Sequence, residues 1–160
     1  MQSGPVARPR PAFFTFPFVT DFPNSRPDAD LLALRPAVPT EPAEPGTVAG
    51  FLHATLRPVL KLQNDLLLAA VADFVLDHHI PLAATGDTDR QRLLAELLAR
   101  NTKLRYTVVG LITGLFTAAE SAFYRPHRPE LNRRLLDLAR QRVLDQASAV
   151  AELVAATPAG

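Results

Sequence analysis

The sequence predicts an all-α protein, a compact bundle of five or six helices with an extended proline- and phenylalanine-rich N-terminal arm. Three observations predict this class. Beyond residue 46, apolar residues recur every three or four positions, as on a helix face. No segment shows the two-residue alternation of a half-buried β-strand. Ten of the 15 prolines lie in residues 1–45, where their fixed φ angles and missing N–H groups disfavour helices and central strands. We therefore expect an extended or disordered arm, 1–45, and a helical domain, 46–160.

The arm is unusual because it carries more than half of the phenylalanines, namely Phe13, Phe14, Phe16, Phe18 and Phe22. Disordered linkers are ordinarily poor in aromatic residues. One interpretation is that the arm folds back and buries these rings on its own helical domain, since an exposed apolar patch is costly. The other is that the rings form a linear motif for the groove or sheet edge of a protein partner.

The first helical elements lie between Gly46 and Arg100. Residues 47–57 form a first turn or two, and Pro58 either kinks a long helix or begins the next one. The apolar line expected here consists of Val59, Leu62, Leu66, Ala70 and Phe74, flanked by Leu60, Leu67, Val71 and Val75. Pro81 and Gly86 end this unit. A capping-box pattern at 88–91, with Thr88 as N-cap, predicts the start of the next helix.

The second half of the domain begins at Asn101 or Thr102, either of which caps a segment that is apolar nearly all round. We expect this segment to be the central helix. A second capping box, 117–120, begins a short helix to Tyr124. Pro129 then opens the last helix, from about 130 to 155. Its stripe of alanine and valine residues suits helix–helix contact with a second copy of the chain.

Composition and charge exclude several classes of site. The chain has 17 Lys+Arg against 16 Asp+Glu, a net charge of +1, so no overall field attracts nucleic acid or an anionic membrane. The absence of cysteine excludes disulfides, thiolate metal sites and cysteine nucleophiles. The most metal-like group, around Asp73 and Asp77, includes the adjacent His78 and His79, which cannot chelate from one helix face. We expect a cytoplasmic protein with no membrane segment, no metal site and no cofactor.

Segments 55–71 (TLRPVLKLQNDLLLAAV), 101–124 (NTKLRYTVVGLITGLFTAAESAFY) and 130–146 (ELNRRLLDLARQRVLDQ) carry a resemblance to a known family. They resemble a small family of all-helical bacterial proteins of unknown function whose members are often labelled "glyoxalase". The resemblance covers about residues 47–146 and leaves out the arm. These motifs are structural and name no reaction. Where the family begins its final helix with a serine cap, this chain has Arg128-Pro129.

The glyoxalase label can be compared with the chemistry of the known glyoxalases. The metal-dependent isomerase uses β-sheet modules, the thioester hydrolase uses a T-H-x-H-x-D-H loop, and the cofactor-free type uses a nucleophilic cysteine. The sequence predicts no strands and contains neither the loop nor a cysteine. We interpret the label as a mis-annotation and assign no catalytic residue.

Basic residues are concentrated in the segment 125–142, which includes Arg125, Arg128, Arg133 and Arg134. A helix that follows a glycine-containing corner is typical of helix-turn-helix DNA-binding proteins. Acidic neighbours at helical spacing oppose this interpretation, because Glu130 can pair with Arg133 or Arg134 and Asp137 with Arg133. Paired arginines contribute less to the binding of a phosphate backbone.

Three functions follow from these observations. The first is a non-catalytic cytoplasmic interaction protein that self-associates as a dimer through helical faces. The second is binding of nucleic acid or phosphate by the four arginines. The third is a small-ligand protein or enzyme of the kind that the family label implies, with a pocket between the central helix and its neighbours. That pocket is expected to be lined by Tyr106, Phe116, Phe123 and Tyr124.

Overall fold

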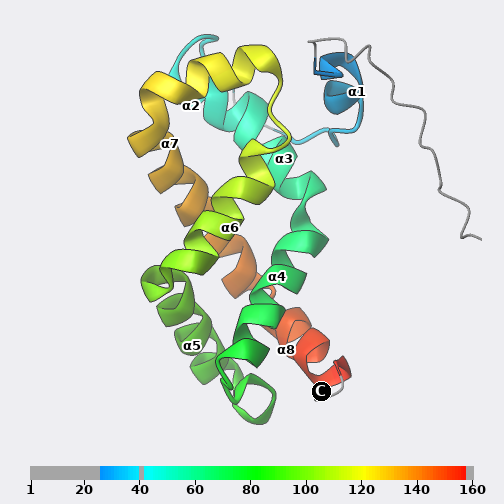
Figure 1. Ribbon diagram of the computed structural model, residues 1–160, viewed down its shortest axis with the longest axis vertical. Coiled ribbons are helices and arrows are strands. Elements are labelled where there is room, and N and C mark those ends of the chain that lie inside the picture. Colours follow the sequence, from blue (N-terminus) through cyan, green and yellow to red (C-terminus); the bar gives the residue numbers. More distant parts are fainter. Residues whose placement is uncertain (1–25, 40–41, 158–160) are drawn as a thin grey trace, which may run out of the picture.

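The computed structural model describes residues 26–39 and 42–157, so the phenylalanine run of the arm lies outside the described residues. All regular elements in the described part are helical and none is a strand, which confirms the all-α class (Figure 1). None of the helices described is both long and apolar enough to cross a membrane.

Part of the arm is helical, contrary to the expectation of an extended chain up to residue 45. Helix α1 spans Asp28–Ala33, with Pro27 as its N-cap residue and Leu34 as its C-cap residue. Pro27 accepts a hydrogen bond from the N–H of Leu31 and Pro36 follows the helix, so the prolines flank this element. Proline is tolerated at a helix start because no intrahelical donor is lost there.

A nearly continuous helical rod follows, composed of α2 (Val48–Phe51), a π-helical turn (Leu52–Leu56) and α3 (Arg57–Leu62). Thr47 caps α2 by accepting the N–H of Gly50. Pro58 is the second residue of α3 and follows the π-helical turn almost directly. The rod ends at Gln63, whose φ of −91° and ψ of 11° are not helical.

Helix α4 (Asn64–Asp77) follows the break at Gln63. The apolar line expected to face the core is wrong in this helix, because Leu66 is 57% exposed. The residues buried instead are Leu67, Leu68, Val71, Ala72 and Val75. Leu60, Leu67, Val71 and Val75 are spaced seven, four and four positions apart, so one helix face continues past Gln63 and packs into the core.

Helix α5 spans Asp87–Arg100 and α6 spans Thr102–Thr113. The cap predicted at Asn101 is confirmed, since its side chain accepts the N–H of Leu104 at 2.9 Å. The cap predicted at Thr88 is wrong, because Gly86 is the N-cap residue and α5 begins two residues earlier than predicted, at Asp87. The expectation of a central α6 is also wrong. Its buried residues follow one line, Leu104, Val108 and Ile112, while Tyr106 is 75% exposed.

The longest helix is α7 (Ala118–Asp145), and it begins at the predicted capping box of Thr117 and Glu120. It then runs through Pro126 and Pro129, where two separate helices were expected. Each proline leaves a carbonyl four residues earlier without its usual donor. Those carbonyls belong to the exposed residues Ala122 and Arg125, where water can satisfy them. The real break lies at Gln146, before α8 (Ala147–Ala156).

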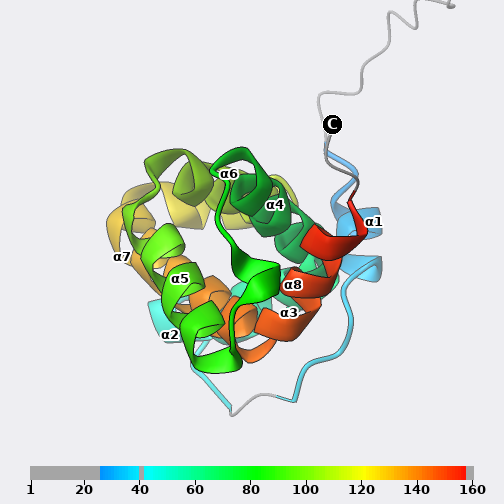
Figure 2. The same cartoon turned by 90° about the horizontal axis from the view of Figure 1, so that it is seen from below.

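The helices enclose one hydrophobic core (Figures 1 and 2). Helix α4 packs against α8 and α6, while α5 packs against α6, α7 and α8. The core side of the last two helices is formed by Leu131, Leu135, Ala139, Val143, Ala147, Val150 and Ala151. Most of the alanine/valine stripe that the sequence offered for self-association is therefore buried inside the molecule.

Candidate functional site

The arm is attached to the helical domain by a salt bridge between Arg35 and Glu120, which we call the clasp. Two guanidinium nitrogens of Arg35 donate to the two carboxylate oxygens of Glu120, at 2.5 and 2.7 Å. One of them also donates to the carbonyl oxygen of Leu115 at 3.0 Å. The side chains are 7% and 16% exposed, so this pair lies largely out of water.

The Glu120 carboxylate is fully committed to these structural contacts. Thr55 Oγ1 donates to Oε1 at 2.7 Å, and the backbone N–H of Thr117 donates to Oε2 at 2.8 Å. Burial would raise the pKa of Glu120, but hydrogen bonds from Arg35, Thr117 and Thr55, together with the charge of Arg35, lower it from 4.5 to about 2. Such a group stays ionised at neutral pH and is poorly suited to proton transfer.

Two further contacts fix the arm at the corner between α6 and α7. Arg26 donates to the carbonyl oxygen of Gly114 at 2.6 Å. The carboxylate of Asp28 accepts the backbone N–H of Ala118 at 3.0 Å, at the positive end of the α7 dipole. The arm therefore caps the first turn of α7 on one side, while Thr117 caps it from within the chain.

The first candidate binding surface is the groove between α6 and α7, which has a volume of about 220 Å³. It is lined by Thr102, Arg105, Tyr106, Val109, Asn132 and Leu136, none of which is acidic. At its α7 edge, Tyr124 donates its hydroxyl to Asn132 Oδ1 at 2.5 Å. The guanidinium carbon of Arg128 lies over the Tyr124 ring, 5.8 Å from its centroid.

The four predicted arginines separate into two groups. Arg134 pairs with Glu130 at 2.8 Å, as the four-residue spacing suggested. Arg125, Arg128 and Arg133 are exposed, and none forms an ion pair with another residue in 26–39 or 42–157. Positions 125, 128 and 132 are spaced three and four apart, so Arg125 and Arg128 share the side of α7 that Asn132 presents to the groove.

The four predicted pocket residues do not line one cavity. Phe116 is 1% exposed and packs against Phe51 and Tyr124, with ring centroids 5.4 and 5.5 Å apart. Phe123 stacks on Phe51 at 5.1 Å and borders a separate apolar hollow near the start of α2. Tyr106 instead lines the α6–α7 groove together with Asn132, whereas Tyr124 donates to Asn132 without lining that groove.

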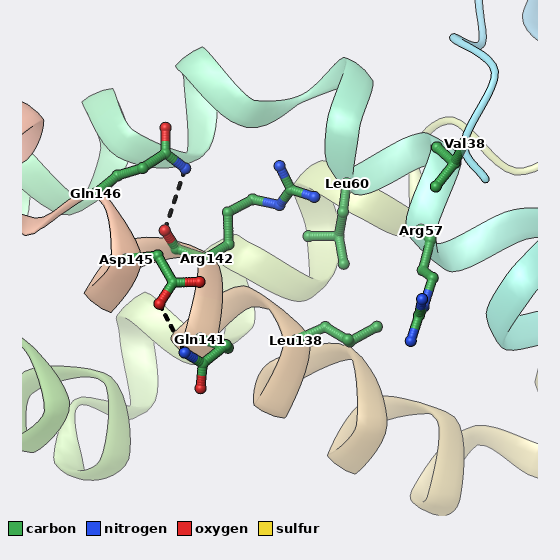
Figure 3. A pocket seen from close by; sticks show the side chains of 8 residues that line it. All are labelled: Val38, Arg57, Leu60, Leu138, Gln141, Arg142, Asp145 and Gln146. Carbon is green, nitrogen blue, oxygen red and sulfur yellow. Dashed lines mark hydrogen bonds between the residues drawn. The ribbon is translucent and has the colours of Figure 1, made fainter. Parts of the chain in front are cut away.

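A second candidate is the cleft between α3 and α7, which has a volume of about 310 Å³ (Figure 3). Its polar residues are Arg57, Gln141, Arg142, Asp145 and Gln146. Its apolar residues are Val38, Leu60 and Leu138, the first of which comes from the arm. Gln141 donates to Asp145 Oδ1 at 2.7 Å. Asp145 and Arg142, whose spacing allowed an ion pair, do not form one.

Sequence reasoning missed this cleft and the clasp because both join distant segments. Arg35 and Glu120 are 85 positions apart, and Arg142 meets Asn64 across 78. Asn64 and Gln146, next to the two helix breaks, also exchange amide hydrogen bonds of 2.9 and 3.1 Å. Arg57 of the cleft directly precedes Pro58, and the sequence indicated only a helix kink or a helix start at that proline.

His78, His79 and their acidic neighbours do not gather into a metal site. His78 Nδ1 lies 2.8 Å from the carbonyl oxygen of Phe74, and its Nε2 lies 3.1 Å from Asn101. No group of three or more metal-ligating side chains occurs in the described chain segments.

Comparison with known proteins adds no relative from which a function could be transferred. No protein-family model, no curated protein and no solved structure matches the chain. The resemblance noted in the sequence therefore stays a prediction, and the functional argument rests on the two surfaces described above.

Proposed function

We propose that this protein is a non-catalytic binding protein whose α6–α7 groove holds single-stranded nucleic acid. The observation that carries the proposal is a 75% exposed tyrosine, Tyr106, beside arginines without ion-pair partners among the described residues. Single strands are bound by a positively charged groove that follows the phosphates and by aromatic rings on which bases stack. Arg105, Arg125 and Arg128 would supply the first element, and Tyr106 the second.

Fewer arginines in the segment 125–142 are paired with acidic residues than the helical spacing predicted. Of the expected partners, Glu130 is engaged with Arg134 alone, and Asp137 forms no ion pair with any residue in the described ranges. The groove lining contains no carboxylate that would repel a phosphate. Because the net charge of the chain is only +1, the attraction of phosphates would come from the arginines of this surface and not from an overall field.

Fluorescence anisotropy with a labelled 20-nucleotide oligothymidylate tests the proposal at several salt concentrations. Each phosphate contact contributes about 0.7 to the slope of log K against log salt for a single strand. We expect R125A/R128A to lower the slope by about 1.4, and Arg92→Ala, an arginine paired with Asp89 on α5, to leave it unchanged.

Tyr106 provides a second and independent readout. Tyr106→Ala should weaken binding by about 1–3 kcal/mol through the loss of one stacked base, while Tyr106→Phe should bind almost as well as the wild type. No anisotropy change at 100 µM protein and about 50 mM salt would refute the proposed function.

Self-association through helical faces is a second candidate, favoured by apolar side chains that remain outside the core. Leu66 on α4 is 57% exposed and Leu153 on α8 is 39% exposed. Sedimentation velocity from low to high micromolar protein should show a dimer that Leu66→Glu or Leu153→Glu dissociates. A monomer at several hundred micromolar would remove this candidate.

A further inference from the structure

We propose that the α3–α7 cleft binds a small amphiphilic monocarboxylate, with its head group between Arg57 and Arg142 and its chain on Leu60 and Leu138. This inference is independent of the nucleic-acid proposal, because the cleft shares no lining residue with the α6–α7 groove. Its volume of about 310 Å³ is at the lower end of the range for small-molecule sites.

Two arginines from different helices belong to the lining of the cleft. Arg57 follows the π-helical turn directly, and its Nε is buried without a hydrogen-bond partner among the described residues. Arg142 makes one long contact of 3.3 Å to Asn64 Oδ1. A guanidinium group can donate two parallel hydrogen bonds to one carboxylate, so these side chains favour a carboxylate head group.

The charge of the lining favours a monoanion. Two arginines and Asp145 give the lining a net charge of +1, which complements a carboxylate better than a doubly charged phosphate. Figure 3 shows Leu60 between the two arginine side chains, and Asp145, bound to Gln141, on the side of Arg142 that faces away from Arg57. The head group therefore belongs between the arginines and away from Asp145.

The apolar wall is completed by Val38 of the arm. Lys61 on α3 donates to the carbonyl oxygen of Ala37 at 3.1 Å, and the clasp at Arg35 holds the preceding residues. These two contacts hold the chain immediately before Val38, and so they keep Val38 over the cleft. A bound aliphatic chain therefore touches the arm as well as the helical domain.

Isothermal titration calorimetry of the full chain with sodium octanoate tests the proposal, and amide NMR shifts locate the site. We expect octanoate to bind at least tenfold more tightly than octanol or octyl phosphate and to shift amides near Arg57 and Arg142. Octylamine should not bind. Equal affinity for octanol, or tighter binding of octyl phosphate, would overturn the carboxylate assignment.

Variants separate the head-group contacts from the cavity itself. Arg57→Gln and Arg142→Gln should each weaken octanoate binding at least tenfold, while Arg134→Gln, outside the cleft, should not change it. Leu138→Trp keeps both arginines but fills the cavity, so it should abolish binding even if Arg57→Gln proves unstable. Unchanged octanoate affinity in Leu138→Trp, or no heat and no amide shift at 10 mM octanoate, would refute the site.

Discussion

Replacing Glu120 by glutamine tests whether the clasp holds the arm on the helical domain. The exchange keeps the size of the side chain but removes its charge and one of its two acceptor oxygens. Arg35, only 7% exposed at its side chain, would then lie beside a neutral group. Breaking one partner of a buried pair leaves an uncompensated charge, which destabilises more than the pair itself stabilises.

The magnitude follows from the pKa of Glu120. A fall from 4.5 to about 2 corresponds to about 3 kcal/mol in favour of the ionised, folded state, at 1.36 kcal/mol per pKa unit. We reduce this to about 2 kcal/mol because the site keeps some contact with solvent, which screens the charges. Glu120→Gln should lower the free energy of unfolding by about that amount at pH 7.

The pH dependence has a definite sign. The folded pKa of Glu120 lies below its unfolded value, so the contribution is complete above about pH 4.5 and is lost as the pH falls toward 2. The stability difference between wild type and Glu120→Gln should therefore shrink between pH 5 and pH 2.5. Both proteins share all other carboxylates, so the difference isolates this one.

Urea denaturation followed by circular dichroism at pH 7, 4 and 2.5 measures this difference. Hydrogen exchange of residues 26–39 shows separately whether the arm has detached. Glu130→Gln is the matched control, because Glu130 forms an exposed pair with Arg134 that should contribute less than about 1 kcal/mol. Equal stability of wild type and Glu120→Gln at pH 7, with unchanged arm protection, would refute the reasoning.

Two glycines and one cap give further predictions, each measured by the same denaturation assay. A Cβ at Gly110 on α6 would meet no atom within 4 Å, so Gly110→Ala should stabilise by about 0.5–1 kcal/mol. A Cβ at Gly50 would lie 2.3 Å from the carbonyl oxygen of Glu44, so Gly50→Ala should destabilise, and equal effects at both sites would contradict this account. Asn101→Ala should cost about 1 kcal/mol by removing the α6 cap, whereas Asn101→Asp should retain most of it.

Several local features could be predicted from the sequence because they depend on neighbouring residues. Thr117 and Glu120 satisfy each other's backbone N–H groups within a single turn, so their capping box was readable from a four-residue pattern. The same holds for Asn101. Thr88 shows the limit of such patterns, since α5 begins two residues earlier, with Gly86 as its N-cap residue.

The candidate site could be predicted only in part. The sequence singled out Arg125 and Arg128 but could not separate them from Arg134, because spacing permits an ion pair without forming one. It named Tyr106 and Tyr124 as lining a shared pocket, but in the structure Tyr106 lines a surface groove with Asn132, and Tyr124 only donates a hydrogen bond to Asn132. Exposure is a tertiary property, and residue type did not reveal it for Tyr106.

The sequence by itself determined the helical class and two of the helix caps, at Thr117 and Asn101, since each depends on contacts within about one helical turn. Only the tertiary structure decided which face of α4 is buried, how α7 continues through two prolines, and which distant residues form the clasp and the cleft. Arg35 and Glu120 carry no mutual signal in the chain. Their pairing exists because the packed helices bring residues 85 positions apart within hydrogen-bond distance.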